Sequence, residues 1–151
     1  VAGNCRREPE ERARRVRELH TPYHAAIEAE LDAFARRGVK PAFVQIHSFT
    51  PVLKSRPRIW QLGVLWDRDP RLAVPLLARL RREAGVEVGD NQPYSGRDGF
   101  GYTAKAHAGA RGLPDALIEL RQDLLADSAG LRRWAGVIAN ALAEVVPAAL
   151  G

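Results

Sequence analysis

Residues 60–84 have the sequence WQLGVLWDRDPRLAVPLLARLRREA, in which an apolar run leads directly into an amphipathic pattern. The run 60–66 has the length and the apolar content of a buried strand. Asp69 followed by Pro70 is typical of a helix N-cap with proline in the first turn. The leucines expected to face inward from this helix are Leu72, Leu76, Leu77 and Leu80. We therefore expect a strand and then a helix that runs to Ala84, which is the repeating unit of α/β folds.

Two helices are predicted before this unit. Residues 9–19 are polar and favour a helix, with acidic side chains early, where the helix dipole prefers them. Thr21 and Pro22 repeat the cap-and-proline signal, so a second helix should start or kink there and run to Arg37, with Gly38 ending it. Its apolar face would consist of Tyr23, Ile27, Leu31 and Phe34.

Three further strands are expected from short apolar runs. Residues 42–46 form a buried strand that ends at His47, residues 86–88 form a short third strand, and residues 116–121 form a fourth. The stretch 89–101, GDNQPYSGRDGFG, consists of loop-forming residues. Its density of polar groups and glycines is typical of a loop that faces a substrate.

The C-terminal part supplies more helices. Residues 103–111 predict a short helix, and a last amphipathic helix should begin at an N-cap, either Asp127 or Ser128. The residues expected to be buried by that last helix are Leu131, Trp134, Ile138, Leu142 and Val145. Strands that alternate with helices predict an α/β fold, a mixed or mostly parallel sheet flanked by helices, in one domain over residues 1–151.

The composition restricts the function classes. The chain has 151 residues, a single cysteine (Cys5), no methionine and a net charge of +5. One cysteine excludes an internal disulfide framework and a cysteine-rich zinc site. No apolar run approaches the roughly 20 residues that cross a bilayer, and the N-terminus does not resemble a signal peptide. Arginines account for most of the positive charge and are interspersed with glutamates, so we expect a cytoplasmic protein without a nucleic-acid or membrane partner.

Two residues carry the strongest chemical signal. His47 lies at the carboxyl end of a predicted strand, where α/β proteins bind ligands, so it could ligate a metal, act as a base or only hydrogen-bond a loop. Alternation along 116–121 places Glu119 and Arg121 on one face of an otherwise apolar strand. Burying such charges is costly unless they are paired or ligated. They could pair with each other or with a neighbouring strand, or Glu119 could be a carboxylate of a functional site.

Five segments together resemble the N-formylglutamate amidohydrolase family, a zinc-carboxypeptidase-like group of hydrolases with a phosphorylase/hydrolase-like α/β fold. They are YHAAIEAEL, PAFVQIHSFTP, GVLWDRDPRLA, VGDNQPYSGRDGFGYT and HAGARGLPDALIELRQDL. The resemblance implies hydrolysis of N-formyl-L-glutamate to formate and L-glutamate, late in histidine breakdown. It also implies that His47 is a Zn²⁺ ligand and that Glu119 is the carboxylate that activates water.

The resemblance suggests further site residues. Those expected to hold the carboxylates of an N-acyl amino acid are Arg68, Asn91, Tyr94, Arg97 and Arg121. Those expected behind the metal ligands are His20, Tyr23, His24 and His107. Members of the family are longer and carry another metal-binding motif near their N-terminus. We therefore expect this chain to be a C-terminal portion with the other ligands elsewhere. The alternative is a binding or structural protein with the same fold and an incomplete metal site.

Overall fold

The computed structural model describes residues 8–151. These residues fall into two compact units, with the boundary between Lys40 and Pro41. The first unit contains α1 (Pro9–Arg15), a π-helical turn η2 (Val16–His20) and α2 (Thr21–Arg36). Thr21 was expected to cap α2, but it has helical dihedrals and its amide bonds the carbonyl of Val16. The helix is therefore continuous. A wider turn directly before Pro22 accommodates a residue that lacks an N–H donor.

The end of α2 and its charged neighbours follow ordinary helix chemistry. Gly38 ends the helix as predicted, with a positive φ of 68°. Leu31 is buried, whereas Tyr23 on the predicted apolar face is exposed.

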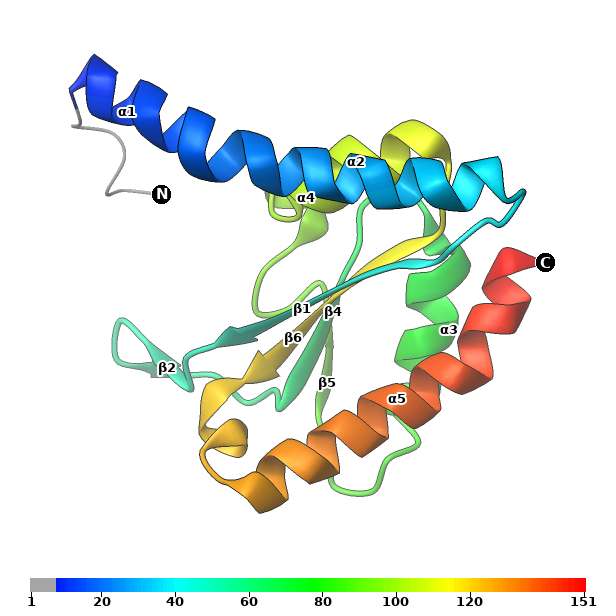
Figure 1. The fold of residues 1–151 in the computed structure, drawn as a ribbon. Helices are drawn as coiled ribbons and strands as arrows, with labels where there is room; N and C mark the ends of the chain where they lie inside the picture. Colours follow the sequence, from blue (N-terminus) through cyan, green and yellow to red (C-terminus); the bar gives the residue numbers. More distant parts are fainter. Residues whose placement is uncertain (1–7) are drawn as a thin grey trace. The chain divides into compact units, whose positions relative to one another are not determined.

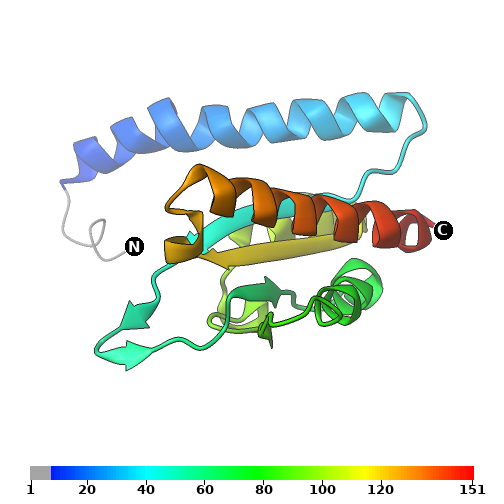
Figure 2. The same cartoon turned by 90° about the horizontal axis from the view of Figure 1, so that it is seen from below.

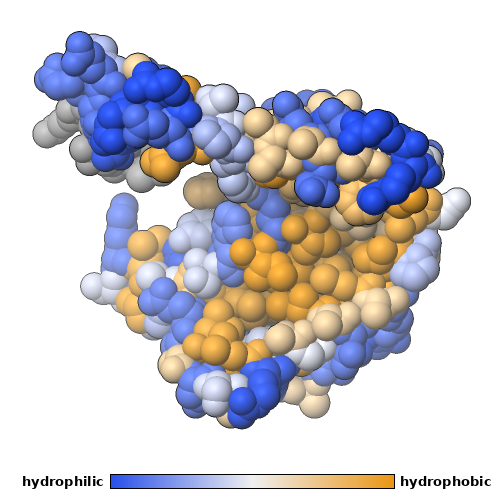
Figure 3. All heavy atoms as spheres, in the orientation of Figure 1, coloured by the Kyte–Doolittle hydropathy of each residue, from blue (hydrophilic) through white to orange (hydrophobic). Residues whose placement is uncertain are grey.

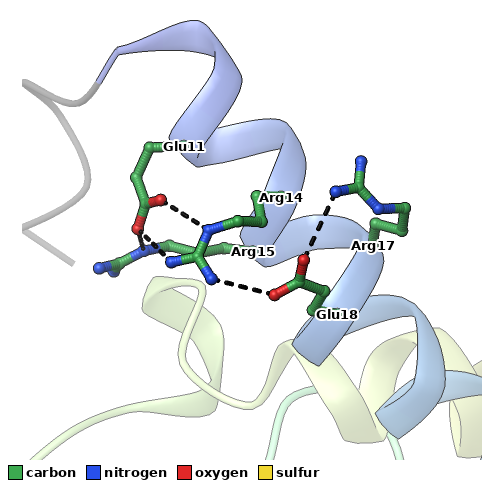
Figure 4. A network of polar contacts seen from close by, with 5 residues as sticks. All are labelled: Glu11, Arg14, Arg15, Arg17 and Glu18. Atoms are coloured by element: carbon green, nitrogen blue, oxygen red, sulfur yellow. Dashed lines mark hydrogen bonds and ion pairs between the residues drawn. The ribbon is translucent and has the colours of Figure 1, made fainter.

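The basic residues of α1 and η2 are largely engaged in ion pairs within the same helix (Figure 4). Arg14 bonds both Glu11 and Glu18, Arg15 bonds Glu11, and Arg17 lies beside Glu18. Hydrogen bonds from Arg14 and Arg15 lower the pKa of Glu11 to about 2. The arginine-rich start of the described chain is thus a solvated, mutually neutralised helix surface.

The second unit is built on a four-stranded sheet with the order β1-β6-β4-β5. The strands are β1 (Phe43–Phe49), β4 (Leu62–Leu65), β5 (Val88–Asp90) and β6 (Asp115–Arg121). β1 pairs with β6 and β4 pairs with β5 in parallel, while β4 and β6 are antiparallel. This mixed sheet confirms the predicted α/β class (Figure 1).

The strands differ from the predictions mainly at their ends. The strand expected at 60–66 is shorter, and the one expected at 86–88 begins at Val88. The reason for the second shift is that the amide of Val86 bonds the carbonyl of Glu83 in the turn after the preceding helix, so the chain extends only later.

A small hairpin between β1 and β4 was not predicted. It consists of β2 (Val52–Leu53) and β3 (Arg56–Pro57), which pair antiparallel. The two linking residues, Lys54 and Ser55, both have positive φ, as two-residue hairpin turns require. Such turns usually contain glycine or asparagine, so Lys-Ser gave no signal for this hairpin in the sequence.

Two helices cover one face of the sheet. These are α3 (Pro70–Leu80) and α5 (Ser128–Leu150), which are capped by Asp69 and Asp127 as predicted. Figure 2 shows α5 lying alongside the strands on this side. The core between these layers contains Leu62, Val64, Leu72, Leu76, Leu80, Ala116, Ile118, Leu120, Trp134, Ile138 and Val145. The predicted inner leucines of α3 are confirmed. Leu131 was expected to be buried but is 52% exposed, and the buried residues of α5 begin at Trp134.

Helices α3 and α5 leave part of this face of the sheet exposed along β1. Ile46 is 57% exposed, although it lies on the same face as Ile118. The space-filling view shows apolar side chains gathered beside α5 in this region (Figure 3). Within residues 8–151, no helix combines the length and the apolar character needed to cross a membrane.

The opposite face of the sheet carries the loop after β5 and a short helical segment. This segment consists of α4 (Tyr102–Ala104), which begins one residue before the expected Thr103, and the π-helical turn η4 (Lys105–Gly109). The loop lies directly on the backbone at Gly63, where an added Cβ would overlap the carbonyl of Gln92. An added Cβ at Gly96 would lie 2.7 Å from the carbonyl of Trp66. Glycines therefore let this loop pack closely on the sheet.

Candidate functional site

His47 and Glu119 lie side by side on the face of the sheet opposite α3 and α5. They are register partners in the parallel pair β1 and β6. Nδ1 of His47 is 3.9 Å from Oε1 of Glu119. The imidazole side chain is 53% exposed and the carboxylate side chain only 8%. The two residues that carried the strongest signal in the sequence therefore form one pair, with an open histidine over a buried glutamate.

The carboxylate of Glu119 lacks the usual stabilisation of a buried charge. Its Oε2 is buried and has no hydrogen-bond partner among the described residues. Burial raises the pKa of Glu119, while the nearby charges of His47 and Arg58 lower it. Glu119 does not form an ion pair with Arg121, which bonds Asp123 instead; its nearest charged partner is His47 on the neighbouring strand β1. A buried carboxylate with a free oxygen suits proton transfer, because its basicity is raised toward neutral pH.

The donors around this pair are of the types that zinc accepts. His47 offers a ring nitrogen and Glu119 a carboxylate oxygen. Beside them on the same face, Oε1 of Gln45 is also buried without a partner. Within the part of the chain that the structure describes, however, no three histidine, cysteine, aspartate or glutamate side chains come together as a metal site. The donor types fit a zinc ion, but these residues supply fewer than the three protein ligands of a usual catalytic zinc site.

Arg58 is a member of this neighbourhood that the sequence did not predict. It directly follows the β2–β3 hairpin, and its amide bonds the carbonyl of Pro51. Its guanidinium lies over the rings of Phe49 and Tyr94, at 5.5 and 4.9 Å from their centroids. The hairpin brings Arg58 back over the end of β1. This position could not be predicted from the sequence, because the hairpin turn itself was not predicted.

Tyr94 and Arg121, both predicted to bind substrate, have structural partners. The hydroxyl oxygen of Tyr94 accepts a hydrogen bond from Arg58 at 3.1 Å, and its ring stacks on Phe100. Arg121 donates to Asp123 at 2.8 Å and to the carbonyl of Arg58 at 3.2 Å. Arg121 therefore holds the backbone that follows the hairpin. It was predicted to bind substrate, and the structure gives it this structural contact instead. Tyr94 keeps its own hydroxyl proton for a further partner.

A cavity of about 570 Å³ lies on the same face of the sheet, beyond Leu117. Leu117 precedes Glu119 by two residues and faces the same side. The charged residues lining the cavity are Arg68, Arg97, Lys105, Asp67, Asp69 and Asp115. The guanidinium of Arg97 lies over the ring of Trp66, 4.9 Å from its centroid. Two predicted substrate-binding arginines thus share one cavity next to the His47–Glu119 pair.

Asn91 supports the wall of this cavity. Its side-chain oxygen accepts hydrogen bonds from the amides of Trp66 and Gly96, at 3.1 and 3.0 Å. Its φ of 51° is unusual for a residue other than glycine but tolerated by asparagine. Asn91 was predicted to contact substrate, and the structure gives its carbonyl oxygen a role in holding the loop to β4.

The predicted supporting histidines are divided between the two units. His20, Tyr23 and His24 lie in the first unit, where the rings of His20 and His24 are 4.2 Å apart. His107 lies in η4 of the second unit and is buried. Its backbone carbonyl accepts a hydrogen bond from Arg111.

Residues 3–126 match the sequence profile of the family described as N-formylglutamate amidohydrolase, which is most of the chain. The chain belongs to the N-formylglutamate amidohydrolase family. The match includes β1, β4, β5 and β6, and so both residues of the His47–Glu119 pair. No curated protein gives a significant match.

Solved structures agree with this membership. Gene product Atu2144 from Agrobacterium tumefaciens is 34% identical, with a TM-score of 0.86 over 96% of this chain. N-formylglutamate amidohydrolase from Ralstonia eutropha JMP134 is 25% identical, with a TM-score of 0.58 over 91% of this chain. This chain spans 59% of the first and 54% of the second. Both proteins therefore contain polypeptide with no counterpart in these 151 residues.

Proposed function

We propose that this chain contributes His47 and Glu119 to the active site of a zinc-dependent amidohydrolase. The reaction is hydrolysis of the amide bond of an N-acyl amino acid, and N-formyl-L-glutamate, giving formate and L-glutamate, is the substrate that the family suggests. The observation that supports this most is the buried carboxylate of Glu119, with one free oxygen, beside the exposed imidazole of His47.

Each residue has one role in this proposal. His47 would hold the zinc ion, together with ligands from polypeptide outside the described residues. When bound, zinc supplies Lewis acidity, which makes water a nucleophile near neutral pH and polarises the amide carbonyl. Glu119 removes a proton from the attacking water at its free oxygen. It then delivers that proton to the nitrogen of the departing amino acid, so that the carboxylate is regenerated.

We place the acidic part of the substrate in the cavity beyond Leu117, at Arg68 and Arg97, although three aspartates of the same lining balance its three cations. Arg68 and Arg97 line it, and guanidinium groups bind carboxylates through paired hydrogen bonds. The stacking of Arg97 on Trp66 holds that side chain in place before substrate arrives. We therefore propose a preference for short acyl groups on acidic amino acids. The partner is this small molecule and no nucleic acid, and the reaction belongs to histidine breakdown in the cytoplasm.

A second candidate function is a binding or structural protein that keeps the fold without complete metal chemistry. The observation that favours it is the shortage of zinc donors among residues 8–151. Zinc analysis of the full-length natural protein separates the two candidates. About one zinc per chain, lost in His47→Ala, supports the hydrolase, and a protein that neither retains zinc nor releases formate supports the alternative.

The substrate preference has its own test. Formate release by the full-length protein is compared for N-formyl-L-glutamate and N-formyl-L-glutamine, which differ in side-chain charge and hardly in shape. Arg97→Ala or Arg68→Ala should raise KM for the acidic substrate by an amount worth about 1.5–3 kcal/mol, the range for a hydrogen bond to a charged group. Equal kcat/KM for the two substrates would contradict a charge-selective cavity.

A further inference from the structure

Arg58 is a buried cation without an anionic partner. Only 7% of its surface is exposed. Its guanidinium donates to the carbonyl of Thr50 at 3.3 Å and to the hydroxyl of Tyr94 at 3.1 Å. In the described part of the chain, no carboxylate oxygen lies within 4.0 Å of a guanidinium nitrogen of Arg58, the distance that defines an ion pair. Buried charges are normally paired, so an unpaired one indicates a place where an anion binds.

The position of Arg58 connects it to the His47–Glu119 pair. Phe49 follows His47 by two residues on the same face of β1, and the guanidinium lies 5.5 Å from the centroid of the Phe49 ring. Arg58 therefore lies along the strands from Glu119, on the side away from Leu117 and the cavity.

Arg58 has donors to spare and is held rigidly. A guanidinium has five N–H groups, and two of them bond Thr50 and Tyr94, which leaves three without a partner among the described residues. The two flanking rings and the two hydrogen bonds fix its plane before any ligand arrives. A fixed guanidinium with free N–H groups matches a carboxylate, which can accept two parallel hydrogen bonds.

We propose that Arg58 binds a carboxylate of the N-acyl amino acid and so positions its amide beside Glu119. The nature of the ligand rests on the proposed function. Arg58 and the cavity lined by Arg68 and Arg97 lie on opposite sides of Glu119 along the strand. A substrate with two carboxylates is then held at both ends, and one with a single carboxylate loses one of its two anchors.

Thermal stability with and without ligand distinguishes an anion-binding Arg58 from a purely structural one. An arginine that served only to hold the hairpin would, when replaced, destabilise the protein with or without ligand. An anion-binding Arg58 carries an uncompensated burial cost in the free protein. Arg58→Gln, which removes the charge and keeps hydrogen-bonding capacity, should therefore leave the Tm of the free protein unchanged or higher. It should also abolish the rise in Tm that an added carboxylate ligand produces.

The experiment uses L-glutamate as the probe, with Tm and calorimetric Kd measured for wild type, Arg58→Gln, Arg58→Lys and Arg56→Gln. Arg56 is an exposed arginine of the same hairpin and is the matched control. We expect at least a 10-fold rise in Kd for Arg58→Gln, a smaller rise for Arg58→Lys, and no change for Arg56→Gln. Wild-type affinity in Arg58→Gln, equal losses in Arg58→Gln and Arg56→Gln, or no glutamate binding by wild type would overturn the proposal. If Arg58→Gln does not fold, Arg58→Lys decides, because wild-type affinity there would exclude a guanidinium-specific site.

Kinetics keep this inference separate from the proposed function. With N-formyl-L-glutamate and the full-length protein, Arg58→Gln should raise KM at least 10-fold and change kcat less. An unchanged KM in an active enzyme refutes the role of Arg58 and leaves the hydrolase standing. Glutamate binding that depends on Arg58, in a protein that releases no formate, supports the anion site and refutes the hydrolase.

Discussion

Glu119 is the residue whose replacement tests the chemistry most directly. Glu119→Gln keeps the size and the hydrogen-bonding capacity of the side chain and removes its basicity. In the full-length protein we expect kcat for N-formyl-L-glutamate to fall by about 10²–10⁴, the usual contribution of a general base, with zinc content and Tm retained. Glu87→Gln, on the exposed carboxylate of Glu87, is the control and should change nothing. Near-wild-type turnover by Glu119→Gln would exclude Glu119 as the base.

Asp115 gives a second prediction at this scale. Burial, and then the charges of Asp69 and Asp67, raise the pKa of Asp115 to about 6. In the unfolded chain the pKa of this carboxyl is about 3.9. Between about pH 4 and 6 the unfolded chain loses the proton while the folded protein keeps it, so the free energy of unfolding falls as pH rises. Above pH ~6 the folded protein has lost the proton as well, and the free energy of unfolding falls no further.

Asp115→Asn removes this charge and should stabilise the protein at pH 8. We expect a gain of about 1–2 kcal/mol, which allows for solvent screening of a half-buried group, and almost no gain at pH 4. Thermal unfolding of both proteins at the two pH values measures it, with Asp98→Asn at an exposed position as the control. A gain that is equal at pH 4 and pH 8 would mean that the charge of Asp115 is not the cause.

Residues inside regular elements were predictable and residues placed by turns were not. The period of two along β6 identified Glu119, and the end of an apolar run identified His47, because both signals are local. Arg58 reaches the same face through a hairpin whose turn, Lys54-Ser55, has no glycine or asparagine. Asn91 and Arg121 were selected for their chemistry, and the fold uses both to hold backbone groups.

Among the elements, the contact between β4 and the loop after β5 controls the shape of the cavity. Gly63 of β4 lies directly under the carbonyl of Gln92, where a methyl group would overlap it. Gly63→Ala must push the loop away from the sheet, so we expect a loss of about 1–3 kcal/mol of stability, the typical cost of overpacking. Gly136→Ala is the matched control, because Gly136 lies in α5 with no atom near its added methyl. That change should stabilise by about 0.5–1 kcal/mol.

Chemical denaturation of the two glycine variants gives the comparison. A Gly63→Ala protein as stable as Gly136→Ala would show that the loop yields without cost. At the level of elements, the strands and the two covering helices followed from apolar patterns and caps. The loop that forms the cavity wall did not, because its path depends on close contacts of glycines with distant backbone.

For the whole molecule, the decisive quantity is how many zinc ligands these 151 residues supply. A catalytic zinc site needs three protein ligands, and within residues 8–151 no three suitable side chains gather. This chain spans 59% and 54% of the two matched structures, and our proposal assigns the remaining zinc ligands to polypeptide outside residues 8–151. We therefore expect the isolated 151-residue chain, loaded with zinc and dialysed, to retain far less than one zinc per chain by elemental analysis. The full-length natural protein should retain about one and lose it on His47→Ala. Stoichiometric zinc in the isolated chain would instead require a complete ligand set within it, with His20 and His24, whose rings are 4.2 Å apart, as the first residues to replace.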